Sequence, residues 1–183
     1  MMSGEVLDRP ISKEQIIEKF LALDSDPRFR DFAGKVEINE YGDLLVNAAS
    51  RLHVVVQKRL AAYLEHMLGG EAMTEMPVEV KVQQSDAIRL RVPDIAWSAV
   101  AGFFDGPPEL KVLPRPPELC VEMKSDSNTL KDMREKRDEL LAMGAKEIWF
   151  VFPEQHRAEY YGAEGKRGAS QFDVDLTEFW TLY

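Results

Sequence analysis

The stretch that decides the fold runs from Glu118 to Phe152 and reads ELCVEMKSDSNTLKDMREKRDELLAMGAKEIWFVF. Its first seven residues, from Glu118 to Lys124, alternate between two faces and therefore predict a β-strand. One face of this strand is purely apolar and carries Leu119, Val121 and Met123. The other face carries Glu118, Cys120, Glu122 and Lys124. An acidic and a basic side chain two residues apart should thus project from the same side of a rigid element.

A helix is expected after this strand, since Ser127 to Thr129 can cap its start and Gly144 can end it. The run from Ile148 to Phe152 is continuously apolar, which is typical of a central strand covered on both sides. A strand–helix–strand unit within a chain of mixed helices and strands predicts an α/β fold, with a mixed β-sheet flanked by helices.

The remaining elements are predicted from hydrophobic periodicity and turn residues. They are a helix over about residues 12–23, a hairpin of 35–39 and 44–47, a helix from its cap Ser50 to Leu68, strands over 78–82 and 92–100, and a last hairpin of 158–161 and 171–174. Residues 102–117 contain five prolines and two glycines, so an exposed loop is expected there.

The composition predicts one soluble domain. A chain of 183 residues with 45% hydrophobic content can build one sizeable core; we expect that domain over residues 12–183, after an N-terminal tail of residues 1–11. A single cysteine excludes a disulfide framework and fits a reducing cytoplasm. No segment approaches the ~20 apolar residues of a membrane span, so no membrane association is expected.

The net charge of -9 is unlike the basic footprint that is usual for nucleic-acid binding. The charge is unevenly spread, however. Residues 111–137 hold seven basic and five acidic side chains, which gives a local balance of +2. The part of the chain with the candidate site is therefore its least acidic part.

Two carboxylates stand out as candidate metal ligands. Asp94 follows Pro93 at the start of a strand, and Glu122 interrupts a strand that is otherwise apolar. Two carboxylates can hold Mg²⁺ (or Mn²⁺), and Lys124 could steady an attacking water or the charge on a phosphate. The alternative is ordinary surface chemistry, with a solvated Asp94 and a Glu122–Lys124 ion pair. From the residues alone, the two interpretations of Glu122 stay about equally open.

Three further residues could join the site. Glu37 lies on the strand face opposite Val36 and Ile38, His53 is in the first turn of its helix, and Lys136 flanks the apolar stripe of the helix after Lys124. Each also has a plain alternative, as a surface glutamate, a packing histidine or a solvated lysine. The three histidines lack zinc spacing, and we find no Gly-rich phosphate loop, nucleophile elbow or dinucleotide fingerprint.

These residues, in this order, resemble the PD-(D/E)xK nuclease superfamily and, within it, the putative restriction endonuclease family common in cyanobacteria. The resemblance rests on Val-Pro-Asp-Ile-Ala around Asp94 and on Glu122-Met123-Lys124-Ser125, and it extends over roughly residues 12–180. It implies a restriction-endonuclease-like core, Asp94 and Glu122 as metal ligands, and Glu37 and His53 at accessory positions. The resemblance also implies that many members take their lysine from the following helix, so Lys124 and Lys136 compete for the catalytic role.

The sequence therefore predicts a divalent-metal-dependent nuclease, most simply a DNA endonuclease. Nucleases of this type often pair two sites across a dimer, so a homodimer is one expected assembly. The alternative is a nuclease fold without turnover that serves as a binding or regulatory module, which the acidic net charge favours. A weaker alternative is a metal-dependent hydrolase of small phosphorylated compounds.

Overall fold

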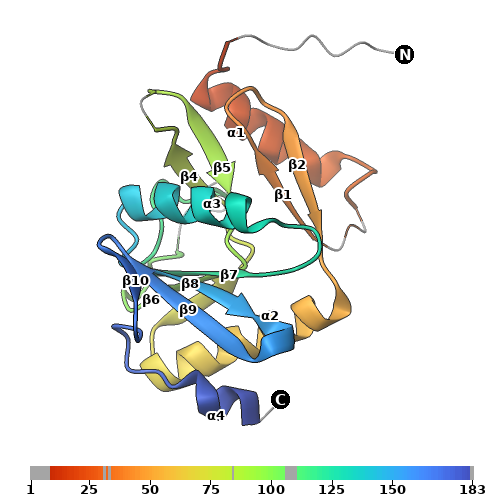
Figure 1. Cartoon of the computed structure of the whole chain (residues 1–183). Coiled ribbons are helices and arrows are strands. Elements are labelled where there is room, and N and C mark those ends of the chain that lie inside the picture. Colours follow the sequence, from red (N-terminus) through yellow and green to blue (C-terminus); the bar gives the residue numbers. More distant parts are fainter. Residues whose placement is uncertain (1–8, 31, 33, 84, 106–110, 182–183) are drawn as a thin grey trace.

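The computed structural model describes residues 9–30, 32, 34–83, 85–105 and 111–181 and arranges their strands in two sheets (Figure 1). One sheet has six strands in the order β10-β9-β8-β7-β6-β3, and the other has four in the order β2-β1-β5-β4. The strands are β1 Gly34–Ile38, β2 Leu44–Ala48, β3 Glu71–Thr74, β4 Val78–Lys81, β5 Ile88–Arg91, β6 Ile95–Ser98, β7 Leu119–Met123, β8 Glu147–Phe152, β9 Arg157–Gly162 and β10 Gly165–Arg167. The helices are α1 Lys13–Ala22, α2 Arg51–Leu68, α3 Leu130–Ala142 and α4 Leu176–Thr181, with short 3₁₀ turns at Leu23–Ser25 and Pro153–Gln155.

The six-stranded sheet is mixed, as predicted. Strands β7 and β8 pair in parallel, with Glu122 opposite Phe150, and α3 makes the crossover between them. The other pairings in this sheet are antiparallel. The α/β fold class predicted from the 118–152 stretch is thus confirmed.

Helices cover both faces of the six-stranded sheet. In Figure 1, α2 and α4 lie below it and α3 lies above it. A hydrophobic core lies on each face of this sheet, and alternate residues of β7 contribute to one or the other. Leu119, Val121 and Met123 pack with α2 and α4. Cys120 packs with Met133 and Leu140 of α3. Because both faces of β7 are buried, a charged residue on this strand must find partners inside the protein.

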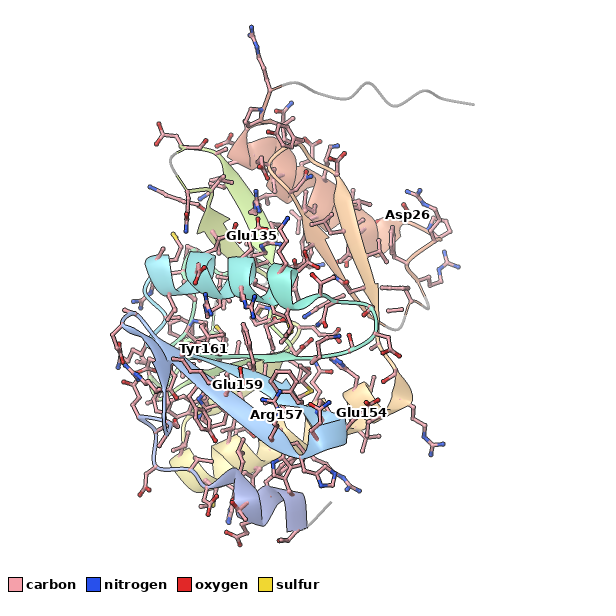
Figure 2. All side chains as sticks on the ribbon, viewed as in Figure 1. Asp26, Glu135, Glu154, Arg157, Glu159 and Tyr161 are labelled. Carbon is pink, nitrogen blue, oxygen red and sulfur yellow. The ribbon has the colours of Figure 1, made fainter. Side chains whose placement is uncertain are left out.

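The four-stranded sheet lies on the far side of α3 and is backed by α1 (Figure 1). Its own small core includes Ile16 of α1 with Ile38 and Leu90. Ion pairs join this sheet to α3: Glu135, labelled in Figure 2, accepts from Arg89 of β5 at 2.5 Å. Side chains from the small sheet can therefore reach toward β7 past α3.

Local sequence explains where the predicted helices begin. Ser12 forms a capping box with Gln15 at the start of α1, and Ser50 caps α2 by accepting from the His53 amide. Thr129 forms the equivalent box with Asp132 at the start of α3. Helices α1, α2 and α3 thus start within a residue or two of their predicted positions.

None of the helices in the described part of the chain is long and apolar enough to cross a membrane.

Three parts of the sequence-based prediction were wrong. Strands β3 and β5 and helix α4 were not predicted. The strand placed over 92–100 is only β6, and it starts after Pro93, which has no amide hydrogen for a ladder. The last hairpin joins β9 to β10 instead of 171–174, since Gly165 supplies the positive φ that a tight turn needs. Figure 2 labels Arg157, Glu159 and Tyr161 along β9. Most of the predicted tail, residues 1–8, lies outside the described part of the chain.

Candidate active site

Asp94 and Glu122 lie side by side at the centre of the molecule. Asp94 directly precedes β6, whose Ile95 pairs with Val121 of β7, so the two carboxylates come from adjacent strands. The Asp94 amide donates to Val121 O at 3.0 Å, and the Met123 amide donates to Asp94 Oδ2 at 2.7 Å. Both residues are almost completely buried, with relative exposures of 1% and 2%. The interpretation as solvated surface residues does not describe them.

The cation between these carboxylates comes from Lys35 of β1, which the sequence analysis did not include. Its Nζ lies 2.7 Å from Asp94 Oδ1 and 3.0 Å from Glu122 Oε2, and the residue is buried. One signal could have found it: Lys35 is two residues before Glu37, so both project from the same face of β1. The lysine and the glutamate then reach the six-stranded sheet together.

Lys136 of α3 holds the other side of Glu122. Its Nζ lies 2.6 Å from Glu122 Oε1 and 2.5 Å from Glu37 Oε1, and it also donates to Val92 O at 2.6 Å. The helix lysine therefore bridges two predicted site residues. Its side chain is buried, which excludes the alternative of a merely solvated lysine.

Glu37 connects this cluster to the small sheet. It accepts from the Val92 amide at 2.9 Å and from Arg91 Nη1 at 3.1 Å. Arg91 in turn donates through Nε to Glu139 of α3 at 2.6 Å. Glu37 thus lies inside a chain of buried ion pairs and is not a surface residue.

His53, in the first turn of α2, also contacts Asp94. Its Nε2 lies 3.2 Å from Asp94 Oδ1. One turn further along the same helix, Gln57 donates to the backbone oxygen of Asp94 at 2.7 Å. The accessory position predicted for His53 therefore touches the candidate metal ligand.

Lys124 does not join the carboxylates, contrary to the expectation that it shares a strand face with Glu122. Strand β7 ends at Met123, and the chain turns away where Asn128 accepts from the Ser125 amide at 3.0 Å. Lys124 Nζ instead donates to Ser125 O, and its side chain lines a separate cleft. Of the two competing lysines, only Lys136 contacts Glu122.

Two clefts lead to the cluster. One has a volume of about 360 Å³ and is lined by Lys35, Glu37, Glu122 and Lys136 among others. The second is about 500 Å³ and has His53 and Lys124 in its wall. Glu122 and the two lysines beside it therefore border the smaller cleft, whereas the larger cleft meets the cluster at His53.

The pKa of each carboxyl group in the cluster depends on two opposing effects: burial raises it, and nearby positive charges lower it. Burial would raise the pKa of Asp94, but Lys35, His53 and Lys136 outweigh it and hold this pKa below its usual range. Burial also acts on Glu37, and there Lys136, Lys35 and Arg91 lower the pKa to about 2. For Glu122 burial prevails over Lys136 and Lys35, with Asp94 and Glu37 adding repulsion, and the pKa is raised.

The donor set fits a divalent cation held by few protein ligands. No group of three or more His, Cys, Asp or Glu side chains with metal-binding geometry occurs among the described residues. However, Asp94 and Glu122 already converge on one point, which the Lys35 ammonium occupies. Mg²⁺ is commonly held by one or two carboxylates, with waters and substrate phosphate completing its shell. Asp94 and Glu122 could therefore hold such an ion if Lys35 withdraws.

The chain is similar to known proteins in sequence pattern and in fold. Residues 17–182 match the model of the Uma2 family, described as "Putative restriction endonuclease". The chain is similar in structure to a putative nuclease of DUF820 from Anabaena variabilis, with a TM-score of 0.60 at 14% sequence identity, covering 81% of this chain and 84% of that one. At this identity the likeness shows the fold. No curated protein matches the chain.

Proposed function

Because the chain belongs to the Uma2 family of putative restriction endonucleases, we propose that it is a divalent-metal-dependent nuclease that cleaves DNA as an endonuclease. The observation that carries the proposal is the convergence of Asp94 and Glu122 on one buried cation position. Two carboxylates that face a single point, within reach of two clefts, suit a metal ion and a phosphodiester better than they suit a purely structural role.

Each residue of the cluster would have its own role in phosphodiester cleavage. Asp94 and Glu122 would hold Mg²⁺ or Mn²⁺, which when bound polarises the phosphoryl oxygen and lowers the pKa of water. Lys136 keeps Glu122 in place and brings a positive charge toward the negative phosphate. Glu37 orients Lys136, and Arg91 compensates the charge of Glu37. The acidic net charge implies that DNA contacts are local to the clefts and lack a broad basic surface.

The test is cleavage of supercoiled plasmid with Mg²⁺ or Mn²⁺ by the wild type and by Asp94→Asn and Glu122→Gln. Both variants keep the side-chain shape and remove the charge. We expect wild-type cleavage and its loss in both variants, while Asp138→Asn, at an exposed position of α3, should cleave normally. A wild type that leaves the plasmid intact with either metal would contradict the proposal. Open-circular product indicates nicking by single sites, and linear product indicates paired sites, as in a homodimer.

One observation favours a second candidate, a nuclease fold used as a binding or regulatory module. Lys35 and Lys136 pair with both buried carboxylates and balance their charge within the protein. A protein that never binds metal could keep this network for stability alone. Calorimetric titration with MnCl₂ separates the two candidates: the nuclease should bind Mn²⁺ in a manner that requires Asp94, and the binding module should not.

A further inference from the structure

A further groove lies beside the start of β1 and is lined by three phenylalanines, Phe20, Phe29 and Phe32; we call it the phenylalanine groove. Its volume of about 350 Å³ is in the range that is usual for small-ligand pockets. All three side chains are only partly buried. Phe20 packs against the core of the small sheet, whereas Phe29 and Phe32 belong to none of the hydrophobic cores in the described part of the chain. These two rings therefore line the groove without contributing to a core.

Local contacts hold the two rings at the groove. They meet edge to face, with ring centroids 6.0 Å apart. The guanidinium carbon of Arg28 lies 5.6 Å from the centroid of the Phe29 ring, and Asp26, labelled in Figure 2, pairs with Arg28 at 2.6 Å. A Cβ atom at Gly34 would lie 2.8 Å from Cζ of Phe32, so only glycine at this position leaves the Phe32 ring where it is.

The charged side chains of the groove are suited to a nucleotide. Asp24 is paired with Lys111. The exposed Arg30 and Glu75 also line the groove, and neither has an ion-pair partner among the residues that the structure describes. An arginine can bind a phosphate, and a carboxylate can accept from the N–H groups of a nucleobase. Aromatic rings beside a cation are the features by which proteins bind the unpaired bases of a strand.

The groove also borders the candidate active site. Lys35 lines both the groove and the smaller cleft, in which Glu122 and Lys136 lie. Val92 is a second link, because it lines the groove and its backbone oxygen accepts from Lys136 at 2.6 Å. A strand with a phosphodiester at Glu122 would therefore have a neighbouring nucleotide within reach of the groove.

We propose that the phenylalanine groove binds an unpaired nucleobase of the DNA strand, next to the phosphodiester that is cleaved, an inference that rests on the proposed nuclease function. Phe29 and Phe32 provide the apolar surface against which the base stacks. Arg30 binds a phosphate of the same strand, and Glu75 accepts from an N–H group of the base. The preferred substrate is then DNA with an unpaired nucleotide, single-stranded or locally opened, over a fully paired duplex.

The test is DNA binding in EDTA, measured by fluorescence anisotropy, so that no turnover is needed. One labelled probe is a short single strand of thymidylates, and the other is an abasic strand of the same length, which has the same charge but no bases. Phe29→Ala should weaken binding of the thymidylate strand about 5- to 150-fold, the loss of one base–aromatic stack, and leave the abasic strand unaffected. Phe104→Ala is the matched control, because Phe104 is also partly buried, meets Phe103 edge to face and lines a separate groove. It should bind both strands as the wild type does.

A second variant keeps the inference testable if Phe29→Ala folds poorly. Arg30→Gln changes an exposed side chain and should weaken binding of both strands by the same factor, because a phosphate contact needs no base. Equal binding of the two strands by the wild type, or a Phe29→Ala protein that loses affinity for both alike, would overturn the inference. So would a dimer that Phe29→Ala dissociates while DNA binding stays unchanged, since a second copy would then cover the groove.

These outcomes are separate from the test of the nuclease. Plasmid cleavage by a wild type whose DNA binding does not depend on Phe29 would overturn the inference and leave the nuclease standing. Base-dependent binding that requires Phe29, in a protein that cleaves no plasmid, would support the groove as a base-binding site and contradict the nuclease.

Discussion

Replacing Lys35 by Met tests whether an ammonium group occupies the position that a metal ion would take. Methionine has a similar length but no charge, so Asp94 and Glu122 would lose the cation between them and keep only His53 beside Asp94 and Lys136 beside Glu122. Removing one partner of a buried ion pair costs about 3–5 kcal/mol of folding free energy. For a domain of this size, each kcal/mol lowers Tm by about 2–4 °C, so we expect a fall of roughly 6–20 °C in EDTA.

Divalent metal should reverse much of this loss. An ion that binds the two carboxylates replaces the missing positive charge, and at a concentration of 100 times its Kd it stabilises the folded state by about 2.7 kcal/mol. The Tm of Lys35→Met should therefore rise more with MnCl₂ than the Tm of the wild type, whose own lysine must first withdraw. Calorimetry should likewise find tighter Mn²⁺ binding to the variant.

The assay is thermal unfolding by circular dichroism, in EDTA and across a series of MnCl₂ concentrations. Lys58→Met is the control, because Lys58 is an exposed lysine of α2. A Lys35→Met protein as stable as the wild type in EDTA would refute the buried bridge. A destabilised variant that gains nothing from Mn²⁺ would refute the idea that ammonium and metal share one position.

Three further predictions concern the network and the core. The pKa of Glu37 is about 2, below its ordinary 4.5, because Lys136, Lys35 and Arg91 outweigh burial; its stabilisation is therefore present above pH 4.5 and lost as the pH falls toward 2, and urea unfolding of Glu37→Gln across this window should show a shallower acid loss than the wild type. Lys136→Met should abolish plasmid cleavage while Lys124→Gln retains most of it, since only Lys136 contacts Glu122; the reverse result would restore Lys124 to the catalytic role. Leu64→Ala empties a fully buried site between α2 and the six-stranded sheet and should cost about 2–5 kcal/mol in urea unfolding, with a smaller cost showing that the site collapses.

The fold class could be predicted from sequence because its central signals are local. Hydrophobic alternation defined β7, a continuous apolar run defined β8, and the caps Ser50 and Thr129 defined the helix starts. Strand β3 was missed because it lies at the edge of the six-stranded sheet and is defined by its pairing with β6. Strand β5 was missed although Ile88, Arg89, Leu90 and Arg91 alternate, since the prediction placed a turn before it and the next strand only from residue 92. A four-residue edge strand such as β3 leaves little periodicity to detect.

Only some residues of the candidate site could be predicted from the sequence in the same way. Asp94 and Glu122 could be selected because one follows Pro93 at a strand start and the other interrupts an apolar strand. Lys124 was one of two candidate lysines on the assumption that β7 continues beyond Met123, but β7 ends there and Lys124 does not contact Glu122. Lys35 resembled any lysine of a hairpin exposed to solvent, since nothing local shows that a second sheet buries it.

By itself, the sequence determined the α/β class and the starts of α1, α2 and α3, and it singled out Asp94 and Glu122 as candidates, because each depends on neighbours within one element or one turn. The tertiary structure alone decided which cations meet those carboxylates. Lys35 is 59 residues from Asp94 and 87 from Glu122 in the chain, and Lys136 reaches Glu122 only because α3 packs between the two sheets. Electrostatic energy depends on distance in space and on burial, and neither is encoded in the spacing of residues along a strand.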